Sequence, residues 1–301
     1  MKIVFMGTPD YADRILKRLL DEKEMDVAAV FTQPDRPVGR KKVLMPPLVK
    51  VTALEAGIEV HQPESLKAES VAETIRSYDP DFIVVAAYGQ LLPKVILDIA
   101  PCINLHASLL PKYRGASPIQ EALLHGDKVT GVTAMRMEEG LDSGPVLAWR
   151  VREIWPMTRK NELFETLADD AADLTPRVLR DFHRIAPLPQ CDAEASYCKK
   201  IKKSDGLVTF EMAAEEIYNR FRAYEGWPGI FLQSGLKLLE LIPFPGEGRP
   251  GEIVAVDDEG VTVACAEGAV QIFKVQPPSK KPMEAVAYIR GKRWQVGDLF
   301  L

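Results

Sequence analysis

The first half of the chain alternates short apolar runs with helical patterns, and this alternation constrains the fold more than any other feature. Residues 2–7 form an apolar run, after which Thr8 and Pro9 suit a helix start and apolar residues recur at helical spacing. Residues 81–87 include a continuous apolar run, as found in strands buried on both faces. We therefore predict an N-terminal α/β domain built on a Rossmann-like, mostly parallel sheet.

A change of pattern near residue 190 marks the end of this domain. Residues 190–205 have no helical or strand period, so we predict a linker there. Residues 206–301 contain short alternating runs separated by turn signals, which favour a small antiparallel barrel or sandwich. Because 301 residues suffice for two domains, we place one at residues 1–189 and the other at residues 206–301.

Composition and residue spacing exclude several classes of protein. A chain with 47% hydrophobic and 27% charged residues has an ordinary globular composition and is not expected to be disordered. The longest uncharged apolar stretch, residues 82–88, is far shorter than the ~20 residues of a membrane-spanning helix, and no extended secretory signal is visible at the start. The cysteines match neither zinc-ligand spacing nor a disulfide framework, and three scattered histidines have no ligand spacing, so we expect reduced thiols, a cytoplasmic location and no metal. These residues are Cys102, Cys191, Cys198, Cys265, His61, His125 and His183.

The charges are unevenly distributed. The net charge of −5 gives the whole molecule no attraction to nucleic acid. Three segments are nevertheless locally basic, namely residues 36–50, 199–203 and 274–293. They suggest a polyanionic partner that contacts particular surfaces, although each segment taken alone is also consistent with an ordinary solvated face.

One segment carries candidate catalytic residues. Neither a phosphate-binding loop of the G-x-x-x-x-G-K-[ST] type nor a G-x-G-x-x-G fingerprint is present, which weakens a kinase or dehydrogenase interpretation. Asn104 and His106 share one face of a predicted strand, near its carboxyl end, where ligands of open α/β sheets bind. An amide that stabilises an oxyanion and an imidazole that moves a proton suit acyl transfer, and Asp142 in a turn-rich stretch could orient the imidazole. A buried structural histidine is the alternative for the Asn-x-His pair alone.

A longer set of motifs resembles the folate-dependent formyltransferase family. The central motif is Asn104-x-His106-x-Ser108-Leu109-Leu110-Pro111-x-Tyr113-Arg114-Gly115. It is accompanied by Gly7-Thr8-Pro9-Asp10, Thr32-Gln33-Pro34-Asp35-Arg36-Pro37-x-Gly39-Arg40, Ala87-Tyr88-Gly89-x-x-Leu92-Pro93, Gly131-Val132-Thr133, Gly140-Leu141-Asp142-Ser143-Gly144 and Gln276-Pro277. The basic loop Gln33-Pro34-Asp35-Arg36-Pro37-x-Gly39-Arg40 and the second domain resemble those of the family members that act on charged tRNA.

The resemblance implies a reaction and a site. The expected reaction transfers the formyl group of 10-formyltetrahydrofolate, a cosubstrate, to the α-amino group of initiator methionyl-tRNA for translation initiation. Asn104, His106 and Asp142 would form the catalytic trio. The donor would be bound by Tyr88, Gly89, Ser108, Leu109, Leu110 and Pro111.

The resemblance also implies a tRNA-binding surface on a C-terminal barrel of the oligonucleotide-binding type. Its basic residues would be Arg36, Arg40, Lys41, Lys42, Lys199, Lys200, Lys202, Lys203, Lys280 and Lys281. We expect a monomer with no membrane partner. Two alternatives remain: a formyltransferase for a small amine such as glycinamide ribonucleotide or an amino sugar, and a nucleic-acid-binding protein with an inactive catalytic fold.

Overall fold

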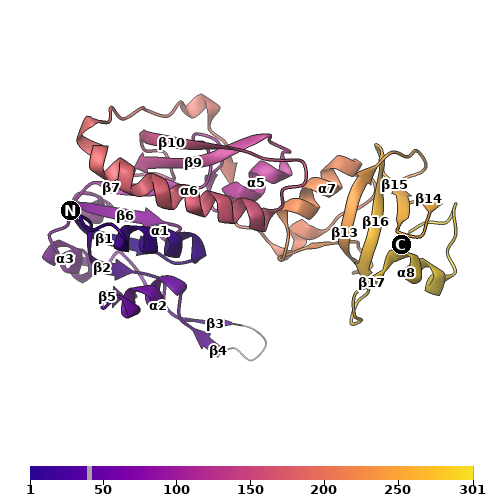
Figure 1. Cartoon of the computed structure of the whole chain (residues 1–301), viewed down its shortest axis with the longest axis horizontal. Coiled ribbons are helices and arrows are strands. Elements are labelled where there is room, and N and C mark those ends of the chain that lie inside the picture. The colour runs from indigo at the N-terminus through magenta and orange to yellow at the C-terminus, as the bar shows by residue number, and fades with distance from the viewer. Residues whose placement is uncertain (39–42, 301) are drawn as a thin grey trace. The chain divides into compact units, whose positions relative to one another are not determined.

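The computed structural model describes residues 1–38 and 43–300 (Figure 1). The chain divides into two compact units, which are described separately. The first unit consists of Met1–Pro118, Lys128–Ile154 and Glu162–Cys198. The second consists of Ile119–Asp127, Trp155–Asn161 and Lys199–Leu301.

A seven-stranded sheet forms the centre of the first unit. Its strand order is β10-β9-β7-β6-β1-β2-β5, in which β5, β2, β1, β6 and β7 are mutually parallel and β9 runs antiparallel to both neighbours. The strands are β1 (Lys2–Gly7), β2 (Asp26–Phe31), β5 (Glu59–His61), β6 (Phe82–Ala86), β7 (Cys102–His106), β9 (Val129–Arg136) and β10 (Val146–Glu153). The predicted Rossmann-like, mostly parallel sheet is therefore confirmed.

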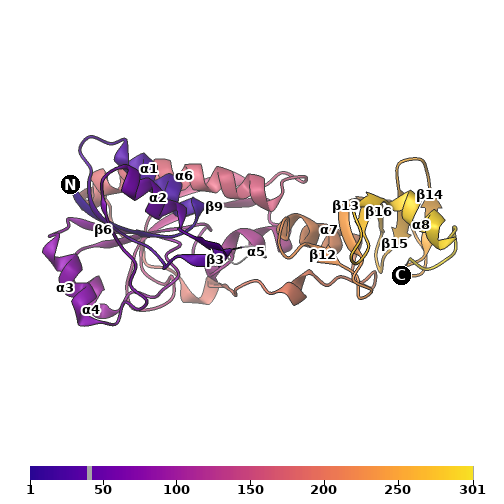
Figure 2. The ribbon, with the colours of Figure 1, turned by 90° about the horizontal axis from the view of Figure 1, so that it is seen from below.

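Helices cover both faces of this sheet. Figure 2 shows α1 and α6 on one face and α3 and α4 on the other. The face under α3 and α4 is closed by a buried cluster of aliphatic side chains that includes Val4, Ile83, Ile75 and Ile96. The helices are α1 (Asp10–Leu20), α2 (Leu48–Glu55), α3 (Glu69–Ser77), α4 (Lys94–Leu97) and α6 (Lys160–Asp181).

Short elements complete the first unit. Two small sheets are formed by β3 (Arg36–Val38) with β4 (Val43–Met45), and by β8 (Arg114–Gly115) with β11 (Tyr197–Cys198). Two single-turn 3₁₀ helices are η1 (Phe182–Arg184) and η2 (Asp192–Glu194). Because β8 and β11 are about eighty residues apart in sequence, their pairing is a long-range contact that no local pattern indicates.

The second unit is built around an antiparallel sheet. Its strands are β12 (Ile230–Phe231), β13 (Lys237–Phe244), β14 (Ile253–Val256), β15 (Val261–Ala264), β16 (Ala269–Gln276) and β17 (Met283–Glu284). Its helices are α5 (Pro118–Leu124), η3 (Lys203–Gly206), α7 (Ala214–Ala223) and α8 (Ala285–Lys292). The strand order is β12-β13-β16-β15-β14, with β17 beside β16. The predicted antiparallel sheet is confirmed, and within residues 199–300 the strand pairing follows an open path that does not by itself close a barrel.

One local expectation needs correction. Thr8 does not cap α1, because Pro9 occupies the capping position and the Thr8 hydroxyl instead donates to the Tyr88 carbonyl at 3.3 Å. In the long helix α6, Pro176 is accommodated within the helix, which continues from Lys160 to Asp181.

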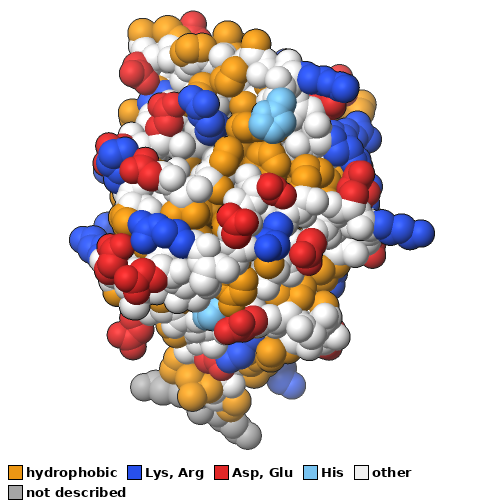
Figure 3. All heavy atoms as spheres, turned by 90° about the vertical axis from the view of Figure 1, so that its left-hand side faces the viewer, with side chains coloured by type: hydrophobic (Ala, Val, Ile, Leu, Met, Phe, Trp, Pro, Cys, Tyr) orange, Lys and Arg blue, Asp and Glu red, His pale blue; other side chains and the backbone are white. Residues whose placement is uncertain are grey.

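The surface and the helices are consistent with the composition. On the face shown in Figure 3, side chains of both charge signs are interspersed with apolar ones. Throughout residues 1–38 and 43–300, no helix combines the length and the apolar character needed to cross a bilayer.

Candidate active site

Loops from three parallel strands meet at the carboxyl edge of the first sheet. Thr8 follows β1, Gln33 follows β2 by two residues, and Tyr88 follows β6. The Tyr88 carbonyl accepts hydrogen bonds from the Thr8 hydroxyl at 3.3 Å and from Gln33 Nε2 at 3.1 Å. This edge is where ligands of open α/β sheets bind, and it is where β7 ends.

The predicted trio comes together at the end of β7. Asn104 and His106 are each 7% exposed and share one strand face, and Asp142 reaches them from the turn between β9 and β10. Asn104 Nδ2 donates to Asp142 Oδ1 at 3.4 Å, and His106 Nδ1 lies 3.7 Å from Asp142 Oδ2. One carboxylate therefore faces both an amide and an imidazole, in a region that is almost inaccessible to solvent.

The hydrogen bond of His106 indicates its tautomer. His106 Nε2 lies 2.9 Å from the Tyr113 carbonyl oxygen. Because a carbonyl oxygen only accepts hydrogen bonds, we assign a proton to Nε2. In the neutral ring, Nδ1 is then the unprotonated nitrogen that faces Asp142, and it becomes a donor to that carboxylate when the imidazole takes up a proton.

Asp142 adopts a backbone conformation that is uncommon for a non-glycine residue. Its φ is +51°, in the left-handed region, which costs about 1–2 kcal/mol for an ordinary side chain. Its Oδ2 accepts a hydrogen bond from the Gly115 amide at 2.8 Å. The carboxylate is therefore aimed by β8, whose own position depends on β11.

The loop predicted to bind the donor is held rigidly over β9. The Thr133 hydroxyl donates to the Ser108 carbonyl at 2.6 Å and accepts from the Leu110 amide at 3.0 Å. The Ser108 side chain is fully buried and donates to the Lys112 carbonyl at 2.6 Å. Leu110 is buried, whereas Leu109 and Pro111 are half-buried and can contact a ligand. Sequence reasoning treated Thr133 only as part of a motif and did not assign it this role in the loop.

Tyr88 and Gly89 occupy different environments. The Tyr88 ring is 2% exposed, and burial raises the pKa of its hydroxyl to about 12. That hydroxyl has no hydrogen-bond partner among the described residues. The ring packs in the same buried cluster as Cys102, with Met137 against it, whereas Gly89 is exposed at φ +87°.

A hollow of about 450 Å³ lies at the start of β7 and the end of β9, and none of the predicted site residues is among its lining residues. Leu97, Cys102 and Met137 supply apolar parts of its lining, and Cys102 is on the same face of β7 as Asn104. Burial raises the pKa of the Cys102 thiol to about 12, so this sulfur behaves as a neutral, apolar wall near neutral pH. The other lining residues are Lys94, Asp98, Pro101, Arg136, Glu138 and Glu139.

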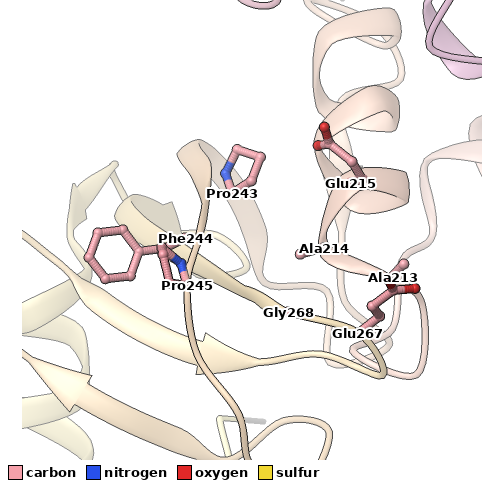
Figure 4. Close-up of a pocket in the computed structure, with 8 residues that line it drawn as sticks. All are labelled: Ala213, Ala214, Glu215, Pro243, Phe244, Pro245, Glu267 and Gly268. Atoms are coloured by element: carbon pink, nitrogen blue, oxygen red, sulfur yellow. The ribbon is translucent and has the colours of Figure 1, made fainter.

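A second hollow, of about 410 Å³, lies in the second unit. Figure 4 shows it between the start of α7 and the end of β13, with the Phe244 ring directed away from α7. Glu215 and Glu267 are its charged lining residues. Its lining contains none of the predicted site residues. Elsewhere too, within residues 1–38 and 43–300, no group of three or more His, Cys, Asp or Glu side chains could hold a metal ion.

The structure describes some of the predicted tRNA-binding residues and not others. Arg36 is exposed at the start of β3 and donates to Gln33 Oε1 at 3.2 Å, whereas Arg40, Lys41 and Lys42 lie outside the described residues. The remaining predicted residues are exposed in the second unit: Lys199, Lys200, Lys202, Lys203, Lys280 and Lys281.

Lys50, in the same basic segment as Arg36, is neutralised by a local partner. Its ammonium donates to both carboxylate oxygens of Asp35, at 2.9 and 3.0 Å. Hydrogen bonds from Gln62 and then from Lys50 hold the pKa of the Asp35 carboxyl below its ordinary value. This ion pair lowers the net positive charge that the segment offers to a polyanion.

Comparisons with known proteins agree with this architecture. The sequence profile described as "Formyl transferase" matches residues 1–179, and "Formyl transferase, C-terminal domain" matches residues 200–293. Methionyl-tRNA formyltransferase of Nitratiruptor sp. is 57% identical over 304 residues, covering 100% of both chains. The protein of the same name from Wolinella succinogenes is 55% identical over 306 residues, covering 99% of both. The crystal structure of HypX from Aquifex aeolicus in complex with tetrahydrofolic acid matches with a TM-score of 0.60 at 19% identity, covering 99% of this chain and 50% of that one, and it shows similarity of fold.

Proposed function

This chain belongs to the formyl transferase family, and we propose that it transfers the formyl group of 10-formyltetrahydrofolate to the α-amino group of initiator methionyl-tRNA. The observation that carries the chemistry is the single carboxylate of Asp142, which faces both Asn104 Nδ2 and His106 Nδ1. The full-length relatives at 57% and 55% identity favour the tRNA substrate over a small amine. HypX, whose fold is similar, binds tetrahydrofolic acid and thereby supports a folate donor.

The trio stabilises the charges that develop during transfer. The donor supplies a formyl carbon bound to nitrogen, and the neutral α-amine forms a new C–N bond to that carbon as the carbonyl oxygen becomes an oxyanion. Asn104 Nδ2 donates a hydrogen bond to this oxyanion, and a protonated His106 stabilises it by the positive charge of its ring. Its collapse reforms the carbonyl and breaks the bond to the donor nitrogen. Asp142 stabilises the imidazolium and helps to pass the proton lost by the amine to the departing nitrogen, directly or through water.

The hollow at the start of β7, lined by Cys102 two residues before Asn104, is the proposed site for the ring system of the donor. Its apolar side includes Leu97, Cys102 and Met137, and its carboxylates can accept hydrogen bonds from ring amino groups. Tyr88 belongs to the buried cluster that contains Cys102 and contacts Met137, and so lies behind the apolar lining of the hollow. Met137 also packs against the cluster that contains Leu110, which brings the hollow next to the 108–111 loop.

The exposed basic residues are proposed to contact tRNA phosphates. Lysines and arginines at phosphates position an RNA without specifying its sequence. In this proposal residues 1–189 carry out catalysis, residues 206–301 bind tRNA, and residues 190–205 connect the two, with the part up to Cys198 packed in the first unit. Arg36 and the residues that follow it contribute to tRNA binding from the first domain. The protein acts as a monomer in the cytoplasm.

Labelled formyl transfer to a panel of acceptors tests this proposal. The acceptors are charged initiator methionyl-tRNA, elongator methionyl-tRNA and glycinamide ribonucleotide, each with 10-formyltetrahydrofolate. We expect product with the initiator only. Transfer to glycinamide ribonucleotide with none to either tRNA would assign the small-amine alternative, and no transfer to any acceptor would contradict a catalytic role.

A further inference from the structure

Residues 188–198 contact the Asp142 turn of the candidate active site and are anchored at both ends. At one end, Leu188 and Val146 exchange two backbone hydrogen bonds of 2.8 Å. At the other end, β11 pairs with β8, and the Arg114 amide donates to the Ser196 carbonyl at 2.9 Å. This segment overlaps the stretch predicted to be a linker, yet up to Cys198 it belongs to the first unit.

Gln190 lies between these anchors and contacts the Asp142 turn directly. Its Nε2 donates to the Asp142 carbonyl at 2.9 Å and to the Gly144 carbonyl at 2.7 Å. Its Oε1 accepts a hydrogen bond from Arg114 Nε at 3.0 Å. Arg114 is itself 2% exposed and is held by Asp192 at 2.9 Å, so the Gln190 amide has a fixed support.

The Asp142 turn needs such support. Asp142 has a positive φ, and Gly140 before it has φ +132°, so the turn is built from uncommon backbone conformations. Leu141, between them, is 45% exposed and does not anchor the turn in a core. The Gly115 amide fixes the carboxylate, and Gln190 fixes the backbone on both sides of Ser143.

We propose that Gln190 is a positioning residue for formyl transfer: it holds the Asp142 turn so that the carboxylate stays aimed at Asn104 and His106. This inference rests on the proposed function, because it assumes that Asp142 takes part in the reaction. Gln190 acts through Asp142 and not on the substrate. Its loss therefore reduces turnover while binding of both substrates is largely kept.

Steady-state kinetics of four single variants test this. Gln190→Ala removes all three contacts, Gln190→Met keeps the volume, and Gln190→Glu keeps the acceptor for Arg114 while losing the donor. Glu194→Ala is the matched control, since that exposed side chain lies in the same segment. For all three Gln190 variants we expect kcat to fall about 10- to 100-fold with KM for tRNA and donor changed less than about threefold. Glu194→Ala should behave as wild type.

A double variant separates this inference from the proposed function. When Asp142→Ala has already removed the carboxylate, adding Gln190→Ala should lower kcat less than about twofold further. Equal losses in both backgrounds would mean that Gln190 acts independently of Asp142, and a wild-type kcat for Gln190→Glu would mean that the donor contacts are not needed; either result overturns the inference. Full activity of Asp142→Ala would instead contradict the role given to Asp142 in the proposed function. Should Gln190→Ala not fold, the Met and Glu variants give the same comparison.

Discussion

At the scale of single residues, the few hydrogen bonds of Asn104 and His106 determine how each side chain is oriented in the candidate site. Asn104 and His106 are almost fully buried, so each of their hydrogen bonds is made in a medium where electrostatic interactions are strong. The 3.4 Å contact from Asn104 Nδ2 to Asp142 is long, which leaves the amide able to turn toward a developing oxyanion. His106, by contrast, is fixed by a 2.9 Å hydrogen bond to the Tyr113 carbonyl.

The hollow at the start of β7 gives a prediction at the scale of single residues. Leu97 is half-buried in its lining, so Leu97→Trp should fill part of its 450 Å³ with the stability of the fold little changed. We expect KM for 10-formyltetrahydrofolate to rise at least about tenfold, because a narrowed pocket excludes the ring system. Leu54→Trp, at an exposed position on α2, is the control and should keep the wild-type KM. An unchanged KM for Leu97→Trp would show that the donor does not bind in this hollow.

At the scale of elements, β8 and β11 connect the fold to the site. Gly115 in β8 donates to Asp142 and has φ +121°, and a Cβ added there would lie 2.2 Å from the Cys198 carbonyl oxygen. Only glycine permits this approach of two backbones. A two-residue strand therefore determines where the Asp142 carboxylate points.

Substitution of this glycine tests the close approach. Gly115→Ala should lower the free energy of unfolding by about 2–4 kcal/mol, because strain at positive φ is added to a backbone clash. Gly57→Ala is the matched control, since Gly57 has φ +72° and an added Cβ there would meet no atom within 4 Å, and it should cost only about 1 kcal/mol. Urea denaturation measures both. Equal losses would show that the contact with Cys198 is relaxed without cost.

The sequence predicted those elements that have local patterns and missed those held by distant contacts. Alternating runs and helical periods indicated the parallel sheet, and the same-face rule placed Asn104 beside His106. The approach of Asp142 was expected from its turn-rich surroundings. Gln190 and Thr133 were not recognised as parts of the site, because the hydrogen bonds that give them their roles join segments far apart in sequence. For Gln190 the available signal was a glutamine that follows Pro187 and Pro189 and begins a stretch with no period, which indicated only a linker.

At the scale of the whole molecule, an acidic protein is proposed to bind an acidic substrate. The net charge of −5 opposes this, so binding must depend on local basic surfaces such as Lys280 and Lys281, which are exposed in the second unit. Ion pairs within the protein reduce the positive charge that is available to tRNA, as Asp35 does for Lys50. Affinity for tRNA should therefore depend steeply on salt and on a few exposed lysines.

A pair of charge-matched double variants tests this. Lys280→Ala with Lys281→Ala should raise KM for tRNA and reduce the slope of log(kcat/KM) against log[salt] by about 1–2, because phosphate contacts are lost. Lys23→Ala with Lys67→Ala changes the net charge equally at exposed positions of the first unit and should leave the slope unchanged. If both pairs shift the slope alike, total charge and not the second unit would govern binding.

A single-turnover assay of His106→Ala tests most directly whether the trio at the end of β7 catalyses formyl transfer. The rate of labelled formyl transfer to charged initiator tRNA is measured with enzyme and donor in excess, so that weakened binding cannot limit it. We expect the rate to fall about 100- to 1000-fold while the Kd for the donor stays near that of the wild type. A rate equal to that of the wild type would contradict the assignment of His106, and with it the proposed mechanism.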